Sequence, residues 1–221
     1  MSNIPTIDSS LIPAFGLDAI CKMIADYEFN TVLDIGCGDG KHSEIFKSCG
    51  KTVTSLDYGK SPYFENNKAK QNIIISDFME YDFQSNKYDA IWCCHVLEHT
   101  LNPNLFLRKI NSVLNENGVL AITVPPLKHE IVGGHISLWN GGLLLYHLIL
   151  AGFDCKNAIL KKYGYNISII LNKTFIDIKK ALVFDNGDIS AIKEYLPQNI
   201  VYNPCMQDLS FNGDIDNINW N

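Results

Sequence analysis

The chain has 221 residues and a formal net charge of −6, and 47% of its residues are hydrophobic. This length suits one domain with a sizeable buried core. The 18 basic residues include a single arginine, Arg108, and no basic stripe is interleaved with aromatic residues. A DNA or RNA partner is therefore not expected, because nucleic-acid readers depend on arginine for bidentate contacts.

The sequence also argues against membrane insertion and secretion. No apolar run approaches the ~20 residues needed to span a bilayer, and the first residues lack the basic and apolar segments of a signal peptide. Seven cysteines, without a C-x-x-C pair, fit a reducing compartment better than a disulfide framework. We therefore expect a cytoplasmic chain with no membrane span.

The first expected element is a helix over Gly16 to Tyr27. Four apolar residues in this segment recur at helical spacing and share one face: Leu17, Ile20, Met23 and Ile24. We expect this helix to cover the edge of a sheet near the mouth of a ligand site.

The segment Val32 to Gly40, VLDIGCGDG, combines a buried strand with a glycine turn. Glycine adopts positive φ without strain and lets a ligand rest on bare backbone. A helix that begins near Lys41 would point its unpaired N–H groups at the same place. A dinucleotide turn, G-x-G-x-x-G, fits less well because its third glycine position is Lys41. A tight turn without any ligand is the plainer alternative.

Two further apolar strands end in acids. The run from Lys51 ends at Asp57, and the run from Ile73 ends at Asp77, just before Phe78. In a doubly wound sheet the carboxyl ends of the strands face the ligand crevice, so both acids are expected beside the glycine turn. There Asp57 can accept hydrogen bonds from two ribose hydroxyls; an aspartate that only caps a turn is the alternative.

A fourth strand-like run, Tyr88 to Cys94, breaks into the sequence HVLEH. His95, Glu98 and His99 form H-x-x-E-H, which also matches an inverted zinc-protease motif. That motif must lie within a helix, whereas His95 ends a strand-like run. A zinc hydrolase is therefore the weaker alternative, and no metal is expected.

The ordered motifs between Thr31 and Pro126 resemble those of class I S-adenosylmethionine-dependent methyltransferases. The resemblance implies an α/β fold with a Rossmann-like, doubly wound, mostly parallel seven-stranded sheet, an antiparallel last strand and helices on both faces. It implies S-adenosyl-L-methionine as cofactor and S-adenosyl-L-homocysteine as product, with Asp77 at the adenine amino group and His95 near the methionine end. The residues expected to bind the cofactor are Asp34, Gly36, Cys37, Gly38, Asp57, Tyr58, Asp77, Phe78, Cys93 and His95.

The later elements follow from helical spacing, turn residues and apolar runs. They are a helix over Asn102 to Asn115, a turn at Asn117-Gly118 into a strand over Val119 to Val124, a buried helix over Leu138 to Ala151, strands around Asp154 to Leu160 and over Asn166 to Leu171, and a helix near Ile189 to Leu196. The polar tail after these elements is expected to be loosely ordered or docked on a partner.

We expect one methyltransferase domain over 1–221. Its parts are an N-terminal helical cap (1–30), a cofactor-binding core (31–126), an acceptor loop with a helix and the last two strands (127–172), and a C-terminal extension (173–221).

The loop after the fifth strand is where an acceptor would be held beside the activated methyl group. It offers three candidate catalytic residues, His129, Glu130 and His135, of which His135 is the first choice as general base. A loop histidine satisfied by backbone or water is the alternative. No base is strictly required, since alignment of the reactants alone can supply roughly 7–11 kcal/mol.

The sequence thus predicts methyl transfer to oxygen or nitrogen of a small polar acceptor. Few aromatic residues occur in the acceptor loop, which points to a sugar or a phosphate-linked intermediate of surface-glycan biosynthesis. A non-catalytic, cofactor-binding scaffold of the same fold is the alternative from another functional class.

Overall fold

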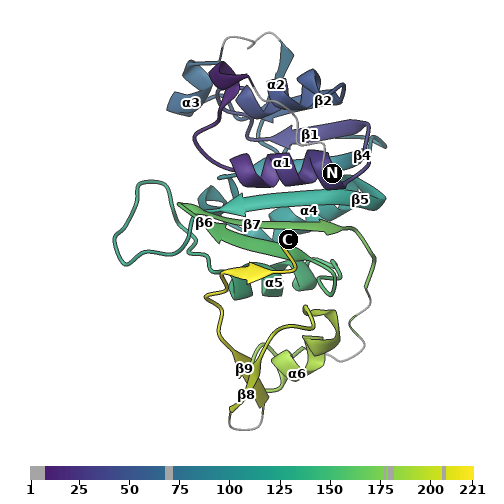
Figure 1. Ribbon diagram of the computed structural model, residues 1–221, viewed down its shortest axis with the longest axis vertical. Coiled ribbons are helices and arrows are strands. Elements are labelled where there is room, and N and C mark those ends of the chain that lie inside the picture. Colours follow the sequence, from purple (N-terminus) through teal and green to yellow (C-terminus); the bar gives the residue numbers. More distant parts are fainter. Residues whose placement is uncertain (1–7, 68–71, 177, 179–181, 206–207) are drawn as a thin grey trace.

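One twisted sheet organises the chain, and in the residues described here it has eight strands in the order β10-β6-β7-β5-β4-β1-β2-β3 (Figure 1). The computed structural model describes residues 8–67, 72–176, 178, 182–205 and 208–221. Residues 1–7, where the sequence predicted no signal peptide, lie outside the described residues.

The strands of the large sheet are β1 (Thr31–Ile35), β2 (Thr52–Asp57), β3 (Ile73–Ile75), β4 (Tyr88–Cys94), β5 (Leu114–Val124), β6 (Ile159–Tyr163), β7 (Asn166–Asn172) and β10 (Asn217–Ile218). The helices are α1 (Leu17–Asp26), α2 (Lys41–Ser48), α3 (Pro62–Glu65), α4 (Pro103–Val113), α5 (Gly141–Leu150) and α6 (Asp188–Ile192), with short 3₁₀ turns η1 (Ser9–Leu11), η3 (Leu97–His99) and η4 (Lys193–Tyr195). A separate hairpin pairs β8 (Tyr202–Cys205) with β9 (Asp208–Phe211).

The strand directions confirm the predicted fold class. Strands β1 to β5 pair in parallel, and β7 runs antiparallel between β5 and β6. Parallel strands need crossover connections, and the connecting helices cover both faces of the sheet. The carboxyl ends of β1, β2, β3 and β4 therefore meet along one edge, as expected from the sequence.

Two apolar cores fill the space between the sheet and its helices. Alternate residues of β4 divide between them: Ala90 and Trp92 pack with α1 and α2, whereas Ile91 and Cys93 pack with α4 and α5. Figure 1 shows α1 in front of the sheet and α4 and α5 behind it. The helix over Gly16 to Tyr27 is thus present as α1, and it covers a face of the sheet rather than an edge.

Three boundaries differ from prediction; for α5 and β6 the difference follows from local hydrogen bonds, and for β5 it follows from an irregular register with β4 between Tyr88 and Ala90. Strand β5 begins at Leu114, and Asn117 lies inside it with φ at +61°. Helix α5 begins at Gly141 because the Asn140 side chain caps it, accepting a hydrogen bond from the Leu143 N–H at 2.7 Å. Strand β6 begins at Ile159 rather than near Asp154, whose carboxylate caps a turn by accepting from the Lys156 N–H at 2.8 Å.

The C-terminal tail is a correction to the expected seven-stranded sheet. Asn217 and Ile218 form β10, an eighth strand that pairs antiparallel with β6. The Ile218 side chain is buried, and Trp220 packs against the core beneath α1. The tail is therefore folded onto the sheet, while α6, β8 and β9 gather at one end of the molecule (Figure 1). In the part of the chain that the structure describes, no helix is both long and apolar enough to cross a bilayer.

Candidate functional site

Backbone hydrogen bonds join the glycine turn to the ends of the neighbouring strands. The N–H groups of Gly36 and Cys37 donate to the Leu56 carbonyl at 2.8 and 3.2 Å, which ties the turn after β1 to β2. The Ser76 N–H donates to the Asp57 carbonyl at 2.9 Å, which ties β2 to the segment that carries Asp77. The acids and the glycine turn thus lie together at one edge of the sheet, which we call the crevice.

Gly36 and Gly38 leave bare backbone at the crevice. Both have positive φ, +71° and +47°, which suits glycine because it lacks a Cβ. A Cβ at position 36 would lie 2.3 Å from Val96 Cγ2, so no side chain fits there. The turn therefore lets a ligand approach bare backbone closely, the property expected of a ligand cradle.

Asp57 connects two turns through its carboxylate. Its side chain is buried, Oδ2 accepts from the Gly38 N–H at 3.0 Å and Oδ1 accepts from the Gly59 N–H at 2.8 Å. A carboxylate has about four lone-pair sites, so each oxygen keeps acceptor capacity for a ligand hydroxyl. The arrangement fixes the carboxylate before any ligand arrives.

Asp34 lies beneath the turn rather than in the open crevice. Its side chain is buried, and Oδ2 accepts a hydrogen bond from Ser43 Oγ at 2.6 Å, which connects β1 to α2. Burial raises the pKa of the Asp34 carboxyl to about 7, against the lowering effect of Ser43. Its position supports the start of α2 below the glycines.

Asp77 and Phe78 separate in the structure. Asp77 is exposed at the end of β3, and its Oδ1 accepts from the Met79 N–H at 2.8 Å. The Phe78 ring is buried against Phe83 and Phe106, with ring centroids 5.6 and 4.7 Å away. The ring thus belongs to the core, which leaves only the Phe78 main chain near the crevice.

The remaining turn residues differ in access. Cys37 and Cys93 are buried, and burial raises the pKa of both thiols, so they stay protonated. Tyr58, which follows Asp57, is exposed. Of these three residues, Tyr58 alone presents its side chain to solvent beside the crevice.

His95 lies at the end of β4 and links the crevice to the N-terminal segment. Its φ is +54°, and its ring stacks on Phe15 with centroids 4.2 Å apart. Asn166 Oδ1 lies 3.1 Å from His95 Nε2 and accepts the Gly16 N–H at 3.2 Å. Neither Phe15 nor Asn166 belongs to a local motif, so the sequence alone did not indicate these two residues.

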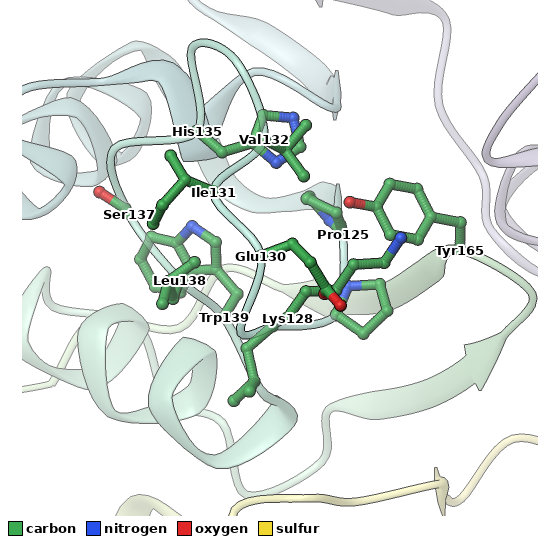
Figure 2. Close-up of a pocket in the computed structure, with 12 residues that line it drawn as sticks. Pro125, Lys128, Glu130, Ile131, Val132, His135, Ser137, Leu138, Trp139 and Tyr165 are labelled. Atoms are coloured by element: carbon green, nitrogen blue, oxygen red, sulfur yellow. The ribbon is translucent and has the colours of Figure 1, made fainter.

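A pocket lies under the loop that follows β5. This loop pocket is lined by residues of the segment 125–139 and by Tyr165 from the turn between β6 and β7 (Figure 2). Glu130 and His135 line it, whereas the expected catalytic residue His129 is exposed and does not. The N–H groups of Ile136 and Ser137 both donate to the Glu98 carbonyl, at 2.9 and 3.2 Å, which fixes the loop against η3.

Tyr165 and Lys128 were not anticipated from the sequence. Lys128 Nζ lies 4.3 Å from the centroid of the Tyr165 ring, and Figure 2 shows the two together on one side of the pocket. The rings of Tyr165 and His95 have centroids 6.0 Å apart. The loop pocket therefore adjoins the crevice through His95.

The H-x-x-E-H string does not form the helix of a zinc protease. His95 has a left-handed backbone after β4, and Glu98 and His99 lie in the three-residue turn η3. The two histidines therefore do not lie one turn apart on a single helix. The strand-like run before His95 had already argued against such a helix.

Comparison with known proteins identifies the motif-bearing region. Residues 33–122 match the family model described as a methyltransferase domain. The ubiquinone biosynthesis O-methyltransferase of Glaesserella parasuis serovar 5 is 28% identical over 196 residues, covering 84% of this chain and 74% of that protein. That of Rickettsia conorii is 30% identical over 175 residues, covering 74% of this chain and 57% of that protein.

Solved structures share the fold at low sequence identity. The PH0226 protein from Pyrococcus horikoshii OT3 has a TM-score of 0.57 and 16% identity, covering 69% of this chain and 86% of that one. The 1,6-didemethyltoxoflavin-N1-methyltransferase of Burkholderia thailandensis, solved with bound 1,6-didemethyltoxoflavin and S-adenosylhomocysteine, has a TM-score of 0.54 and 18% identity, covering 65% and 71%.

Proposed function

Because this chain belongs to the class I S-adenosylmethionine-dependent methyltransferases, we propose that it methylates a hydroxyl oxygen of a small acceptor that binds against the loop following β5. The relatives that are named O-methyltransferases and align over most of the chain support oxygen over nitrogen as the accepting atom. A sugar or phosphate-linked acceptor of surface-glycan biosynthesis finds no support among these relatives. The non-catalytic scaffold and the zinc hydrolase are likewise unsupported by them.

The crevice residues fit the cofactor. We assign the ribose hydroxyls to Asp57, the adenine amino group to Asp77 and the methionine end to the bare backbone at Gly36 and Gly38. The observation that carries this assignment is the doubly anchored Asp57 carboxylate, which has free acceptor capacity beside a turn that excludes any Cβ. His95, between the crevice and the loop pocket, marks the expected position of the methyl group.

S-adenosylmethionine supplies a methyl group already activated by a sulfonium centre. The chain's own residues then have to hold the acceptor in line with it and exclude water, which is the larger share of such catalysis. The loop that follows β5 offers a surface for this, and its hydrogen bonds to the Glu98 carbonyl keep it in place. Glu130 and His135 line the pocket and are the groups that would receive the hydroxyl proton or stabilise its loss.

Two measurements test this function. Calorimetric titration should give binding of S-adenosylmethionine and S-adenosylhomocysteine and none of NAD. Labelled S-adenosylmethionine is then incubated with the protein and matched pairs of small phenols and anilines. Label in the phenol ethers supports the proposal; label only in the anilines overturns the choice of oxygen, and NAD binding without sulfonium binding overturns the cofactor assignment.

A further inference from the structure

Trp139 places a hydrogen-bond donor in the interior without a partner. The residue is 1% exposed, and its Nε1 has no hydrogen-bond partner among the residues that the structure describes. An indole nitrogen can only donate, and a buried donor left unpaired costs free energy that a partner would recover. A group from outside the folded chain is therefore needed to accept from Trp139.

The indole faces the loop pocket. Trp139 is one of the residues that line this pocket, and Figure 2 shows its nitrogen on the edge of the ring that is turned toward Ile131, another residue of the lining. The space inside measures about 10 Å³, which is room for a single water-sized group. The unpaired donor thus faces a space that admits one oxygen atom of an acceptor but not the whole molecule.

The fold holds the indole in place. The Trp139 carbonyl accepts from the Leu127 N–H at 2.7 Å, which closes the base of the loop. The next residue, Asn140, caps α5, and the indole packs at 73° against the ring of His147 on α5, with centroids 5.2 Å apart. His147 Nδ1 is also buried without a partner among the described residues, so the two side chains do not satisfy each other. The direction of the donor is therefore set before any ligand arrives.

The lining of the pocket favours an uncharged oxygen. Most of it is apolar, formed by proline, leucine, isoleucine and valine side chains. Burying a charge there would cost far more than burying a carbonyl group, and Glu130 on the same lining would repel an anion. Lys128 also lines the pocket, but its ammonium group lies over the Tyr165 ring. A carbonyl oxygen, which is satisfied by a donor alone, therefore matches this pocket best.

We propose that Trp139 Nε1 donates a hydrogen bond to a carbonyl oxygen of the acceptor, separate from the hydroxyl that receives the methyl group. The acceptor class is then a small hydroxylated carbonyl compound. Trp139 is too deeply buried for the sulfonium to reach the oxygen that it binds, so that oxygen is not the methylated one. Trp139 is therefore a specificity-determining residue, which selects the acceptor by its carbonyl group.

The inference rests on the proposed function for its place in the reaction, but NMR of the indole N–H groups tests the contact itself. The chain has three tryptophans, and the signal lost in Trp139→Phe identifies the Trp139 N–H. The protein, with S-adenosylhomocysteine added, is titrated with hydroxyaryl ketones and with alkylphenols of the same shape, beginning with 4-hydroxyacetophenone and 4-ethylphenol. The ketone should move the Trp139 signal downfield, and the alkylphenol should leave it in place.

The affinities of the variants give a second readout. Trp139→Phe keeps an aromatic ring and removes the donor, so it should weaken ketone binding about fivefold and leave alkylphenol binding within about twofold. Trp92→Phe is the matched control, because Trp92 Nε1 is also buried without a partner among the described residues. Trp92 packs on the other face of the sheet, with α1 and α2, so its replacement should leave both affinities unchanged.

Three results would overturn the inference: a Trp139 signal that no ketone of the series moves, an equal response to ketone and alkylphenol, or a coupling between the indole N–H and His147 Nδ1. The last would show that the donor is satisfied inside the protein. Methyl transfer from S-adenosylmethionine, measured on the same samples, separates the two proposals. A moved Trp139 signal without any methyl ether supports the carbonyl contact and overturns the reaction, whereas equal methylation of ketone and alkylphenol supports the reaction and overturns the contact.

Discussion

Asp57 and Gly38 are joined by a hydrogen bond of 3.0 Å from the Gly38 N–H to Asp57 Oδ2, which ties the end of β2 to the glycine turn after β1. The second carboxylate oxygen holds the Gly59 N–H in the same way. The acid is therefore both part of the scaffold of the crevice and an acceptor presented to it. This double role makes Asp57 the most informative position for mutation.

Replacing Asp57 with alanine should weaken S-adenosylmethionine binding more than tenfold. The substitution removes the proposed acceptors of two ribose hydroxyls and also leaves two backbone N–H groups without their partner. Calorimetry on the variant measures this loss. Asp26→Ala, which removes a surface carboxylate paired with Lys22 on α1, is the control; equal affinities in the two variants would remove Asp57 from the site.

Gly36→Ala should abolish cofactor binding and destabilise the fold. A left-handed backbone costs a residue with a Cβ about 1–2 kcal/mol, and here the new atom would also meet Val96 Cγ2. Gly50→Ala separates the two effects, because Gly50 has φ at +76° and a Cβ added there would have nothing within 4 Å. Denaturation should give a larger loss of unfolding free energy for Gly36→Ala, and a loss no larger than that of Gly50→Ala would contradict the steric argument.

Because the pKa of Asp34 is raised, the free energy of unfolding should fall as the pH rises. Its pKa is raised from 3.8 to about 7 by burial, so between these values the folded chain keeps a proton that the unfolded chain has lost. Stability then falls with rising pH, by about 4 kcal/mol over the whole window. Asp34→Asn removes the effect and keeps an acceptor for Ser43. Its advantage in unfolding free energy over the unaltered protein should therefore grow from pH 5 to pH 8; a constant difference would argue against a buried neutral acid.

Opposite to the effect of Asp34, the free energy of unfolding should fall as the pH falls, because the pKa of His42 is lowered. Its pKa is lowered to about 4, mainly by burial, while its Nε2 donates to the Phe15 carbonyl at 3.0 Å and its ring packs edge-on against Trp92. The unfolded chain gains a proton below pH 6.5 that the folded chain resists, so stability is lost as the pH falls from 6.5 to about 4. In an Asp34→Asn background, adding His42→Gln should flatten this loss, and an unaltered slope would assign it to another group.

The sequence was sufficient for the parallel core because its signals are local. The glycines at 36 and 38 and the acid at 57 each follow an apolar strand directly, and parallel topology alone brings such ends together. The fold class and the crevice depend on no contact beyond that rule.

The parts that the sequence analysis missed depend on distant partners. Asn166 contacts Gly16 across 150 positions of the chain, and β10 is a two-residue strand whose pairing with β6 has no periodic pattern to announce it. The neighbours of Glu98 likewise come from a loop more than 30 residues later in the sequence. Tertiary contacts between distant residues determine these positions, and such contacts leave no regular spacing in a single sequence.

The return of the chain to β6 also has a consequence for solubility. β10 covers part of β6, and the opposite margin of the sheet is the three-residue strand β3. Short or covered margins give another molecule little backbone to pair with, which is how natural sheets avoid aggregation. Removing the residues from Asn217 onward would leave the whole of β6 as an unpaired edge strand. We would then expect the protein to self-associate through that edge.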